Sequence, residues 1–403
     1  MADGPLRTLR KIWFQLHLWL GIGLVVLMIP LGLSGSALVF SQPLGRALAP
    51  QRYATSGAPA DLPASAYLAA ARQAFGERDN PVEIRPLEVR LPMQPQDPVT
   101  VTGRSGSAAG QGRPAASLTA WLDPRDARVL DVGDPRGGPM GLIHRLHGAL
   151  AIPPAPGSGP GVGRLIVGWL GVAMAVSCLT GLWLWFPRGA MERGWWSRAF
   201  RWRRSPLFTD NLHHLVGFWL CLPLLLLSLT GVYIAFPQQS HALFGAPPPA
   251  VRMGDADRAG GGGGRPPGER RSRDRGDAPT PFSIDQAVAA ALSARPGARA
   301  QVITLPSRRT PAWKIAFAGA EAPVLVDAAS GAVTPAPPEP ARGGDPISRW
   351  MRQTHEGEGL GPVWTWLSFA AGLAPTILGV TGVWLWLLKR RRRRLQIRTA
   401  GPT

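Results

Sequence analysis

Near its start the chain reads LHLWLGIGLVVLMIPLGLSG over residues 16–35, a run whose one ionisable side chain is His17. Apolar neighbours extend it to residues 12–40, and comparable runs follow at 162–186, 210–236 and 362–388. Each is long enough for a helix that crosses a bilayer core, which needs about 20 residues. A soluble protein would have to bury all four, so the pattern predicts four transmembrane helices. A signal peptide is the alternative for the first run, but its length and histidine favour an uncleaved anchor.

The basic residues predict the orientation of these helices. The formal net charge is +19, and Lys and Arg collect in the N-terminal segment 1–11, the loop 187–209 and the tail 389–403. Short basic segments stay in the cytoplasm, so we expect both termini and this loop inside, and the segments 41–161 and 237–361 outside. Topology alone requires charge beside each span, so the basic tail does not indicate nucleic-acid binding.

Tryptophan and cysteine usage agrees with this arrangement. Trp183, Trp185 and Trp384 lie at the predicted cytoplasmic ends of spans, where aromatic belts are common. The two cysteines, Cys178 and Cys221, both fall inside spans. The outer segments therefore contain no disulfide framework, and we interpret both thiols as packing residues.

The second half of the chain repeats the first. The second span ends in TGLWLWFPR (180–188) and the fourth in TGVWLWLLKR (381–390), whereas the first and third begin with LHLWLG (16–21) and LHHLVG (212–217). Self-similarity at a fixed offset is typical of a duplicated unit. We therefore predict that one unit, made of a span, an outer segment and a second span, occurs twice.

The outer segments also correspond. Each has a helical pattern followed by alternating, strand-like sequence, which predicts small α+β domains at 41–140 and 237–345. Ser283 is the predicted N-cap of the helix in the second domain. A histidine-bearing segment follows each domain, at 141–161 and 346–361. Gly-, Arg- and Pro-rich sequence predicts flexible linkers within the two outer segments, at 104–116 and 254–280.

Four of the seven histidines occupy equivalent positions in the repeat, His17 with His213 and His147 with His355. The first two begin outward-going spans, so they are predicted at the cytoplasmic side, and the other two at the outer side. Carboxylates are scarce in the spans, which argues against a proton relay or a hard-metal site. Zinc normally takes four ligands, whereas two imidazoles from facing helices suit six-coordinate haem iron. The alternative is that these are ordinary interfacial side chains.

A small pair recurs in each span: Ser34-Gly35, Thr180-Gly181, Thr230-Gly231 and Thr381-Gly382. Because alternate spans run in opposite directions, each pair is predicted at the depth of one histidine pair. Such residues would leave space for a flat macrocycle, or would simply let the helices pack closely.

Several neighbouring side chains keep the ligand set open. His144 and His214 are alternative ligands to His147 and His213, and His241, which has no repeat counterpart, is predicted on the surface. Three arginines flank the outer histidines and would pair with haem propionates or stay solvated: Arg145, Arg349 and Arg352.

The ordered motifs LHLWLG…LSG, RLHGAL…TGLWLWFPR, LHHLVG…LTGVYIAFP and QTHEGEGLG…TGVWLWLLKR resemble the PepSY-associated transmembrane proteins over nearly the whole chain. The resemblance implies a mainly α membrane protein of the bacterial inner membrane. Its four-helix transmembrane bundle would carry two small α+β PepSY-like periplasmic domains, internally duplicated. This chain departs from the pattern in having Ser34 in place of threonine and a long linker at 254–280.

Some members of the family resemble ferric-siderophore reductases that carry two haems b. The resemblance implies that His17 and His213 hold a cytoplasmic-side haem, and that His147 and His355 hold a periplasmic-side haem. It also implies an oxidoreductase that passes electrons to a periplasmic acceptor, with ferric iron in a siderophore as the favoured one. No dinucleotide fingerprint occurs, so the unidentified donor would be a quinol or another protein.

Two other functions remain as alternatives. The PepSY-like domains would bind or regulate a periplasmic protease or peptide in a protein without enzymatic activity and without haem. A permease for iron complexes is the weaker alternative, because the spans show neither broken helices nor a charged path. In each case the membrane lipid is a partner and nucleic acid is not.

Overall fold

The structure, a computed structural model, divides into two compact units. The bundle unit comprises Met1–Ser41, Leu142–Gly260 and Pro340–Thr403, and the sheet unit comprises Gln42–Gly141 and Gly261–Glu339. The described residues are 5–76, 84–105, 117–154, 161–186, 200, 208–243, 281–307, 310–319, 322–336, 346–358 and 360–399. The predicted linker 254–280 and most of the segments 104–116 and 187–209 lie outside them.

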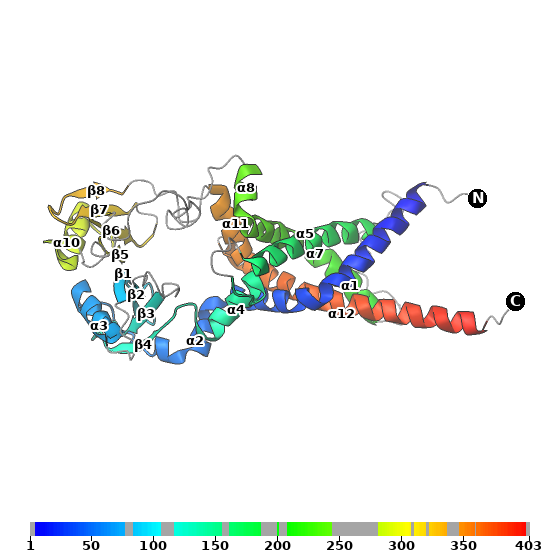
Figure 1. Ribbon diagram of the computed structural model, residues 1–403, viewed down its shortest axis with the longest axis horizontal. Helices are drawn as coiled ribbons and strands as arrows, with labels where there is room; N and C mark the ends of the chain where they lie inside the picture. The colour runs from blue at the N-terminus through cyan, green and yellow to red at the C-terminus, as the bar shows by residue number, and fades with distance from the viewer. Residues whose placement is uncertain are drawn as a thin grey trace, which may run out of the picture. The chain divides into compact units, whose positions relative to one another are not determined.

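Four long helices form the bundle unit (Figure 1). They are α1 (Pro5–Val39), α5 (Val162–Trp185), α7 (Phe208–Ala235) and α12 (Gly361–Thr399). All four are long and apolar enough to cross a membrane, which confirms the four predicted spans. The helix α12 differs from the prediction, because it continues through the basic run without a break. Lys and Arg are good helix formers, so the charge that ends the apolar span does not end the helix.

Each long helix packs against two others: α1 contacts α12 and α5, and α7 contacts α5 and α12. Glycines bring the backbones together. An added Cβ on Gly32 of α1 would collide with the carbonyl oxygen of Gly372 on α12, and one on Gly171 of α5 would lie 2.9 Å from Val232 of α7. Small residues are the usual means of close helix contact in membranes, where lipid is as apolar as the side chains.

Three short helices accompany the long ones in the described part of the bundle unit: α4 (Gly138–Ala149), which begins in the sheet unit, α8 (Pro237–Leu243) and α11 (Pro346–Glu356). The helix α11 packs against α7. The helix α5 begins tightly against the end of α4, because a Cβ on Gly163 would collide with the carbonyl oxygen of Ala149. These contacts fix α4 and α11, which carry His147 and His355, against the long helices.

The sheet unit has one antiparallel sheet in the order β4-β3-β2-β1-β5-β6-β7-β8. The strands from the first outer segment are β1 (Ile84–Arg90), β2 (Val99–Ser105), β3 (Ser117–Leu122) and β4 (Val129–Gly133). Those from the second are β5 (Ala300–Thr304), β6 (Ala312–Phe317), β7 (Val324–Asp327) and β8 (Val333–Pro335). The strand order is therefore symmetric about the β1–β5 pair.

The two outer segments, each predicted as a small α+β domain, contribute four strands apiece to this one sheet. The strands β1 and β5 pair directly, with Val89 opposite Ile303 and Glu88 opposite Thr304. Each segment alone would leave the ladder groups of one of these strands unpaired, and an open edge is a liability. Pairing the two edges satisfies both, so the segments share one sheet.

A single apolar core joins the two segments. The helices α3 (Ala64–Gly76) and α10 (Ile284–Ala294) pack on the sheet, and Tyr67, Val89, Ile303 and Ile315 are fully buried there. The predicted N-cap Ser283 is confirmed, because it forms a capping box with Gln286. Alternating strand residues supply the buried face, as the period of two requires. The short helices α2 (Ser41–Leu48) and η1 (Pro50–Tyr53) precede α3.

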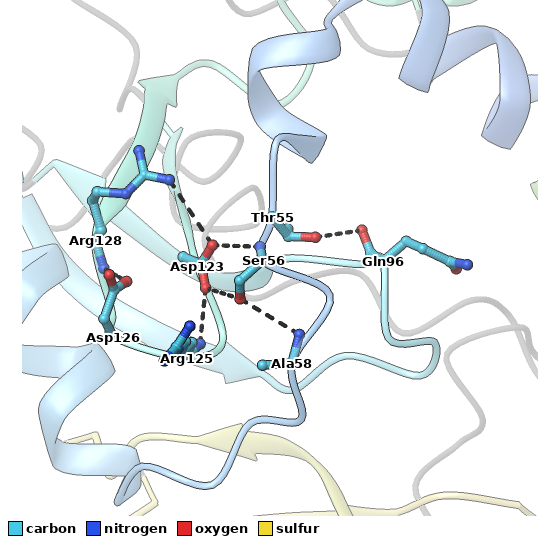
Figure 2. A network of polar contacts seen from close by, with 8 residues as sticks. All are labelled: Thr55, Ser56, Ala58, Gln96, Asp123, Arg125, Asp126 and Arg128. Carbon is cyan, nitrogen blue, oxygen red and sulfur yellow. Dashed lines mark hydrogen bonds and ion pairs between the residues drawn. The ribbon is translucent and has the colours of Figure 1, made fainter.

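A buried carboxylate ties the start of the sheet unit to the end of β3 (Figure 2). Asp123 is 2% exposed and accepts hydrogen bonds from the backbone N–H and the hydroxyl of Ser56, both at 2.6 Å, and from the N–H of Arg125 at 2.9 Å. Burial acts to raise the pKa of Asp123, but these hydrogen bonds and the nearby Arg128 outweigh it and hold the pKa below its usual value.

We predict that Asp123→Asn lowers the free energy of unfolding of the sheet unit by about 1–3 kcal/mol, because it weakens hydrogen bonds to a buried group. Since the folded-state pKa lies below the unfolded value of about 3.9, the carboxylate stabilises fully at neutral pH and less as the pH falls through the folded-state pKa. Thermal unfolding of the detergent-solubilised chain at several pH values measures both effects. Asp126→Asn, which changes an exposed turn carboxylate, is the control. Equal unfolding of Asp123→Asn and wild type at neutral pH would contradict the assignment.

Candidate functional site

The bundle unit brings the four repeat-equivalent histidines together in two facing pairs. The ring centroids of His17 and His213 are 6.5 Å apart at an interplanar angle of 81°. Those of His147 and His355 are 5.9 Å apart at 36°. We call these the first and the second histidine pair. The first lies at the terminal end of the bundle, where α1 begins and α12 ends.

In the first pair, each imidazole is held by a neighbouring helix. Nδ1 of His17 is 3.1 Å from the carbonyl oxygen of Ser177 and 3.0 Å from Oγ1 of Thr180, both on α5. Nδ1 of His213 is 3.0 Å from Oγ1 of Thr381 on α12. The small pairs at 180–181 and 381–382 therefore lie at the depth of these histidines.

The second pair is held in the same way. Nδ1 of His355 is 3.1 Å from both Oγ1 of Thr230 and the carbonyl oxygen of Leu227 on α7. Nδ1 of His147 is 3.0 Å from the carbonyl oxygen of Leu31 on α1. Burial lowers the pKa of His147, and burial with the neighbouring His147 lowers the pKa of His355 to about 4. Both rings are therefore neutral, the form in which imidazole binds a metal.

These partners determine which ring nitrogen is available. A carbonyl oxygen only accepts, so the Nδ1 atoms of His17, His147 and His355 carry the proton. For His213 the hydroxyl of Thr381 donates to the carbonyl oxygen of Ile377 at 2.7 Å, which leaves its lone pair to accept from Nδ1. In a neutral imidazole the other nitrogen, Nε2, then presents its lone pair. Fixing one ring nitrogen in this way is the usual support of a metal-binding histidine.

The glycines of the small pairs lie directly against the imidazoles. A Cβ on Gly35 would lie 2.7 Å from Cε1 of His147, and one on Gly181 would lie 2.9 Å from Cε1 of His17. For Gly231 and His355 the distance is 3.0 Å, and for Gly382 and His213 it is 3.3 Å. The glycines thus leave room for the rings themselves. The sequence had left open whether the small pairs make room for a macrocycle or let the helices pack closely. We call each small pair with its histidine an imidazole clamp.

One of the four imidazole clamps differs from the other three. The hydroxyl of Ser34 donates within its own helix, to the carbonyl oxygens of Pro30 and Leu31. Nδ1 of His147 donates to the carbonyl oxygen of Leu31. Backbone carbonyls also accept from His17 and His355, so the serine clamp keeps the backbone acceptor that these two threonine clamps have.

The alternative ligands take other positions. The ring of His214 stands edge-on to His213 at 6.2 Å, and its Nε2 is 3.6 Å from Oδ1 of Asp210. His144 lies one turn before His147 and is exposed. The geometry therefore favours His213 and His147 as the facing rings. For His241 the backbone lies in α8 and its side chain is outside the described residues.

The flanking arginines lie at the second pair. Arg145, Arg349 and Arg352 are all exposed, and Nη1 of Arg352 is 3.9 Å from a carboxylate oxygen of Glu356. The ion pair is solvated, so it contributes little to stability.

Two arginines that the sequence did not single out cap long helices. Nη2 of Arg10 donates to the carbonyl oxygen of Leu184 at 2.6 Å and Nη1 to that of Phe186 at 3.3 Å, at the end of α5. Arg164 does the same at the end of α7, with Ile234 and Ala235 as acceptors. A cation at a helix C-terminus satisfies free carbonyls and the helix dipole. The apolar runs hide such contacts, because only the fold shows which ends meet.

A cavity of about 1060 Å³ opens between the four long helices at the first pair. Both His17 and His213 line it, with Gly181 and Gly382 beside them. Its deeper wall is apolar and includes Leu24, Met28, Met174, Leu224 and Leu378. A volume of this size suits a ligand at the large end of the drug-sized range.

The spacing of the rings fits a shared metal. With metal–nitrogen bonds of about 2.0–2.1 Å, an imidazole centroid lies about 3 Å from the metal, so two rings on opposite sides are about 6 Å apart. The observed 6.5 and 5.9 Å agree. Among the described residues no group of three or more His, Cys, Asp or Glu side chains could hold a metal ion. At the first pair, two protein ligands with an apolar cavity fit a metal that brings its other ligands with it, as haem iron does.

Comparison with known proteins shows the family to which the chain belongs. A family model described as the PepSY-associated TM region matches residues 14–389, which include both histidine pairs, all of α5 and α7 and most of α1 and α12. No curated protein matches the chain significantly.

We predict that alanine at the clamp glycines displaces the imidazoles in the order of the distances above. On the hypothesis that the histidine pairs hold haem, Gly35→Ala and Gly181→Ala should lower the amount of haem bound per chain, and Gly382→Ala should lower it least. Gly23→Ala is the control, because a Cβ there meets nothing within 4 Å on the same helix as Gly35. It should keep its haem and gain up to about 1 kcal/mol of helix stability. Pyridine haemochrome assays of purified protein measure the content, and equal content in all variants would refute the clamp.

Proposed function

We propose, from the premise that this chain belongs to the family of PepSY-associated TM regions, that it is a di-haem electron-transfer protein of the bacterial inner membrane. It would pass electrons from the cytoplasmic side or the quinol pool to a periplasmic acceptor, ferric iron in a siderophore being the favoured one. The observation that carries the proposal is the pair of facing imidazoles at each of two levels, each ring fixed through Nδ1.

The proposed topology places both termini in the cytoplasm. It is supported by the basic residues at the terminal end of the bundle, above all the run 389–394 that continues α12, because positive charge stays inside. The first histidine pair would then lie near the cytoplasm and the second near the periplasm. The sheet unit would be periplasmic and PepSY-like, and its symmetric strand order supports an internal duplication.

Within this proposal the ligand sets are His17 with His213 and His147 with His355. Two haems b bound there would supply one-electron redox centres near both faces of the membrane. The chain itself orients the imidazoles, since the carbonyls and hydroxyls of neighbouring helices fix Nδ1 and leave the lone pair of Nε2 available to a metal. Apolar side chains such as Leu24 and Met174 line the cavity beside the first pair, and the apolar shell around a metal site influences its redox potential.

The choice of acceptor rests on chemistry and on the resemblance. Siderophores bind ferric iron through hard oxygen donors, and reduction weakens that binding because ferrous iron is a softer, less charged ion. A membrane oxidoreductase of the ferric-siderophore reductase type would therefore release iron on the periplasmic side. A donor protein or quinol would supply the electrons from the other face.

We predict a reduced b-type haem spectrum for the purified chain, expressed with haem supplied and reduced with dithionite. His17→Ala or His213→Ala should remove about half of the haem, and His147→Ala or His355→Ala the other half, since each variant breaks one bis-imidazole site. His144→Ala and His214→Ala are matched controls one residue or one turn away, and should retain it. A wild-type chain without a haem spectrum would refute the proposal and leave a peptide- or protease-binding role to be tested.

We predict the orientation from charge, and reporter fusions measure it. Green fluorescent protein fused after Thr403 should fluoresce, because it folds in the cytoplasm, and alkaline phosphatase at the same point should be inactive. Alkaline phosphatase fused after Asp97, in the sheet unit, should be active. The opposite pattern would invert the assignment of the two histidine pairs.

A further inference from the structure

The first-pair cavity has a strongly basic mouth. Beyond the imidazoles, towards the terminal end of the bundle, five Lys and Arg side chains line it: Arg10, Lys11, Lys389, Arg390 and Arg394. Asp210 is the carboxylate in the lining, and His214 beside it is the other titratable group at this end. The cavity therefore joins an apolar interior to a mouth with an excess of positive charge.

Positive charge at this end is expected from topology alone, but topology does not select a face of the helix. The lining residues of α12 are Pro375, Leu378, Gly379, Gly382, Val383, Leu385, Trp386, Lys389, Arg390 and Arg394. Arg391 and Arg392 belong to the same basic run and are described in the structure, yet they are outside the lining. They point about 100° and 200° away from Arg390 around the helix. Lys389, Arg390 and Arg394 therefore line the cavity, whereas Arg391 and Arg392 do not.

The mouth is also ordered by local contacts. The guanidinium carbon of Arg390 lies 5.3 Å from the ring centroid of Trp386, a cation–π contact with another lining residue. Arg10 is held by its two carbonyl acceptors at the end of α5. Gly382, which contacts His213, and Arg390 are eight positions apart, which is about 12 Å of helix rise. Both cations are thus held near the imidazoles at one end of the cavity.

We propose that this mouth binds the carboxylate groups of the haem held by the first pair, with Arg390 and Arg394 as its principal cations. The inference rests on the proposed function and adds an orientation to it: the apolar part of the ligand faces Leu24 and Met28, and its anionic edge faces the terminal end. Arginine is well suited to carboxylates because its planar fork presents paired donors. An anionic phospholipid has the same combination of apolar body and anionic head, so the experiment must separate the two ligands.

The test compares haemin with haemin dimethyl ester, whose carboxylates are uncharged. The full chain in neutral detergent, with His147→Ala and His355→Ala so that the first pair alone binds, is titrated with each form, and the Soret absorbance gives the two dissociation constants. We expect the free acid to bind more tightly than the ester. Arg390→Gln with Arg394→Gln should reduce this preference by roughly three- to tenfold, the range for two partly exposed ion pairs. Arg391→Gln with Arg392→Gln, which removes the same net charge, should leave the preference intact.

Each other outcome overturns the proposal. If both double variants keep the preference for the free acid, or lose it to the same extent, the two arginines that line the cavity have no special role. A preference that disappears when phosphatidylglycerol is added makes the mouth a lipid site. If both forms bind equally tightly, the carboxylate contact is refuted and the haem assignment stands. If neither form causes a Soret change that depends on His17, the carboxylate contact and the haem assignment are both refuted. The same titration with all four histidines present provides the measurement if the two alanines impair folding.

Discussion

The bundle depends on one interaction, the hydrogen bond from an imidazole Nδ1–H to a carbonyl or threonine oxygen of the adjacent helix. In a membrane an unpaired polar group costs several kcal/mol, roughly the penalty for leaving it in hydrocarbon. The threonine hydroxyls avoid that cost by donating to their own helix and accepting from the ring, as Thr381 does. A glycine next to each of them lets the ring approach. Two adjacent residues, the threonine and the glycine, therefore satisfy the polar group of the ring, allow close packing and fix the orientation of the ring.

Much of the fold could be predicted from the sequence because its signals are local. Apolar length indicated the four spans, and the small pairs were placed correctly at the depth of the histidines because antiparallel helices of known rise fix depth. The N-cap at Ser283 could be predicted for the same reason. These features depend on neighbouring residues or on helix geometry alone.

The rest depended on tertiary contacts that no local pattern contains. Nothing in β1 or β5 says that their edges pair, so the continuous sheet that joins the two outer segments could not be predicted. The contact between glycine and imidazole could not be predicted either, because spacing predicts depth but not that Cε1 of a histidine lies against the glycine. The backbone acceptors, such as the carbonyl of Leu31, have no sequence signal, since every residue has a carbonyl group.

The two halves of the chain depend on each other in a particular way. Every imidazole clamp is internal to one half: His17 rests on Gly181 and His147 on Gly35, both in the N-terminal half, and the other two histidines rest on glycines of the C-terminal half. Each facing pair, however, takes one ring from each half. A half alone would thus orient two imidazoles and complete neither site. The contacts of α1 with α12 and of α5 with α7 therefore create the sites, and the β1–β5 pair joins the same two halves in the sheet unit.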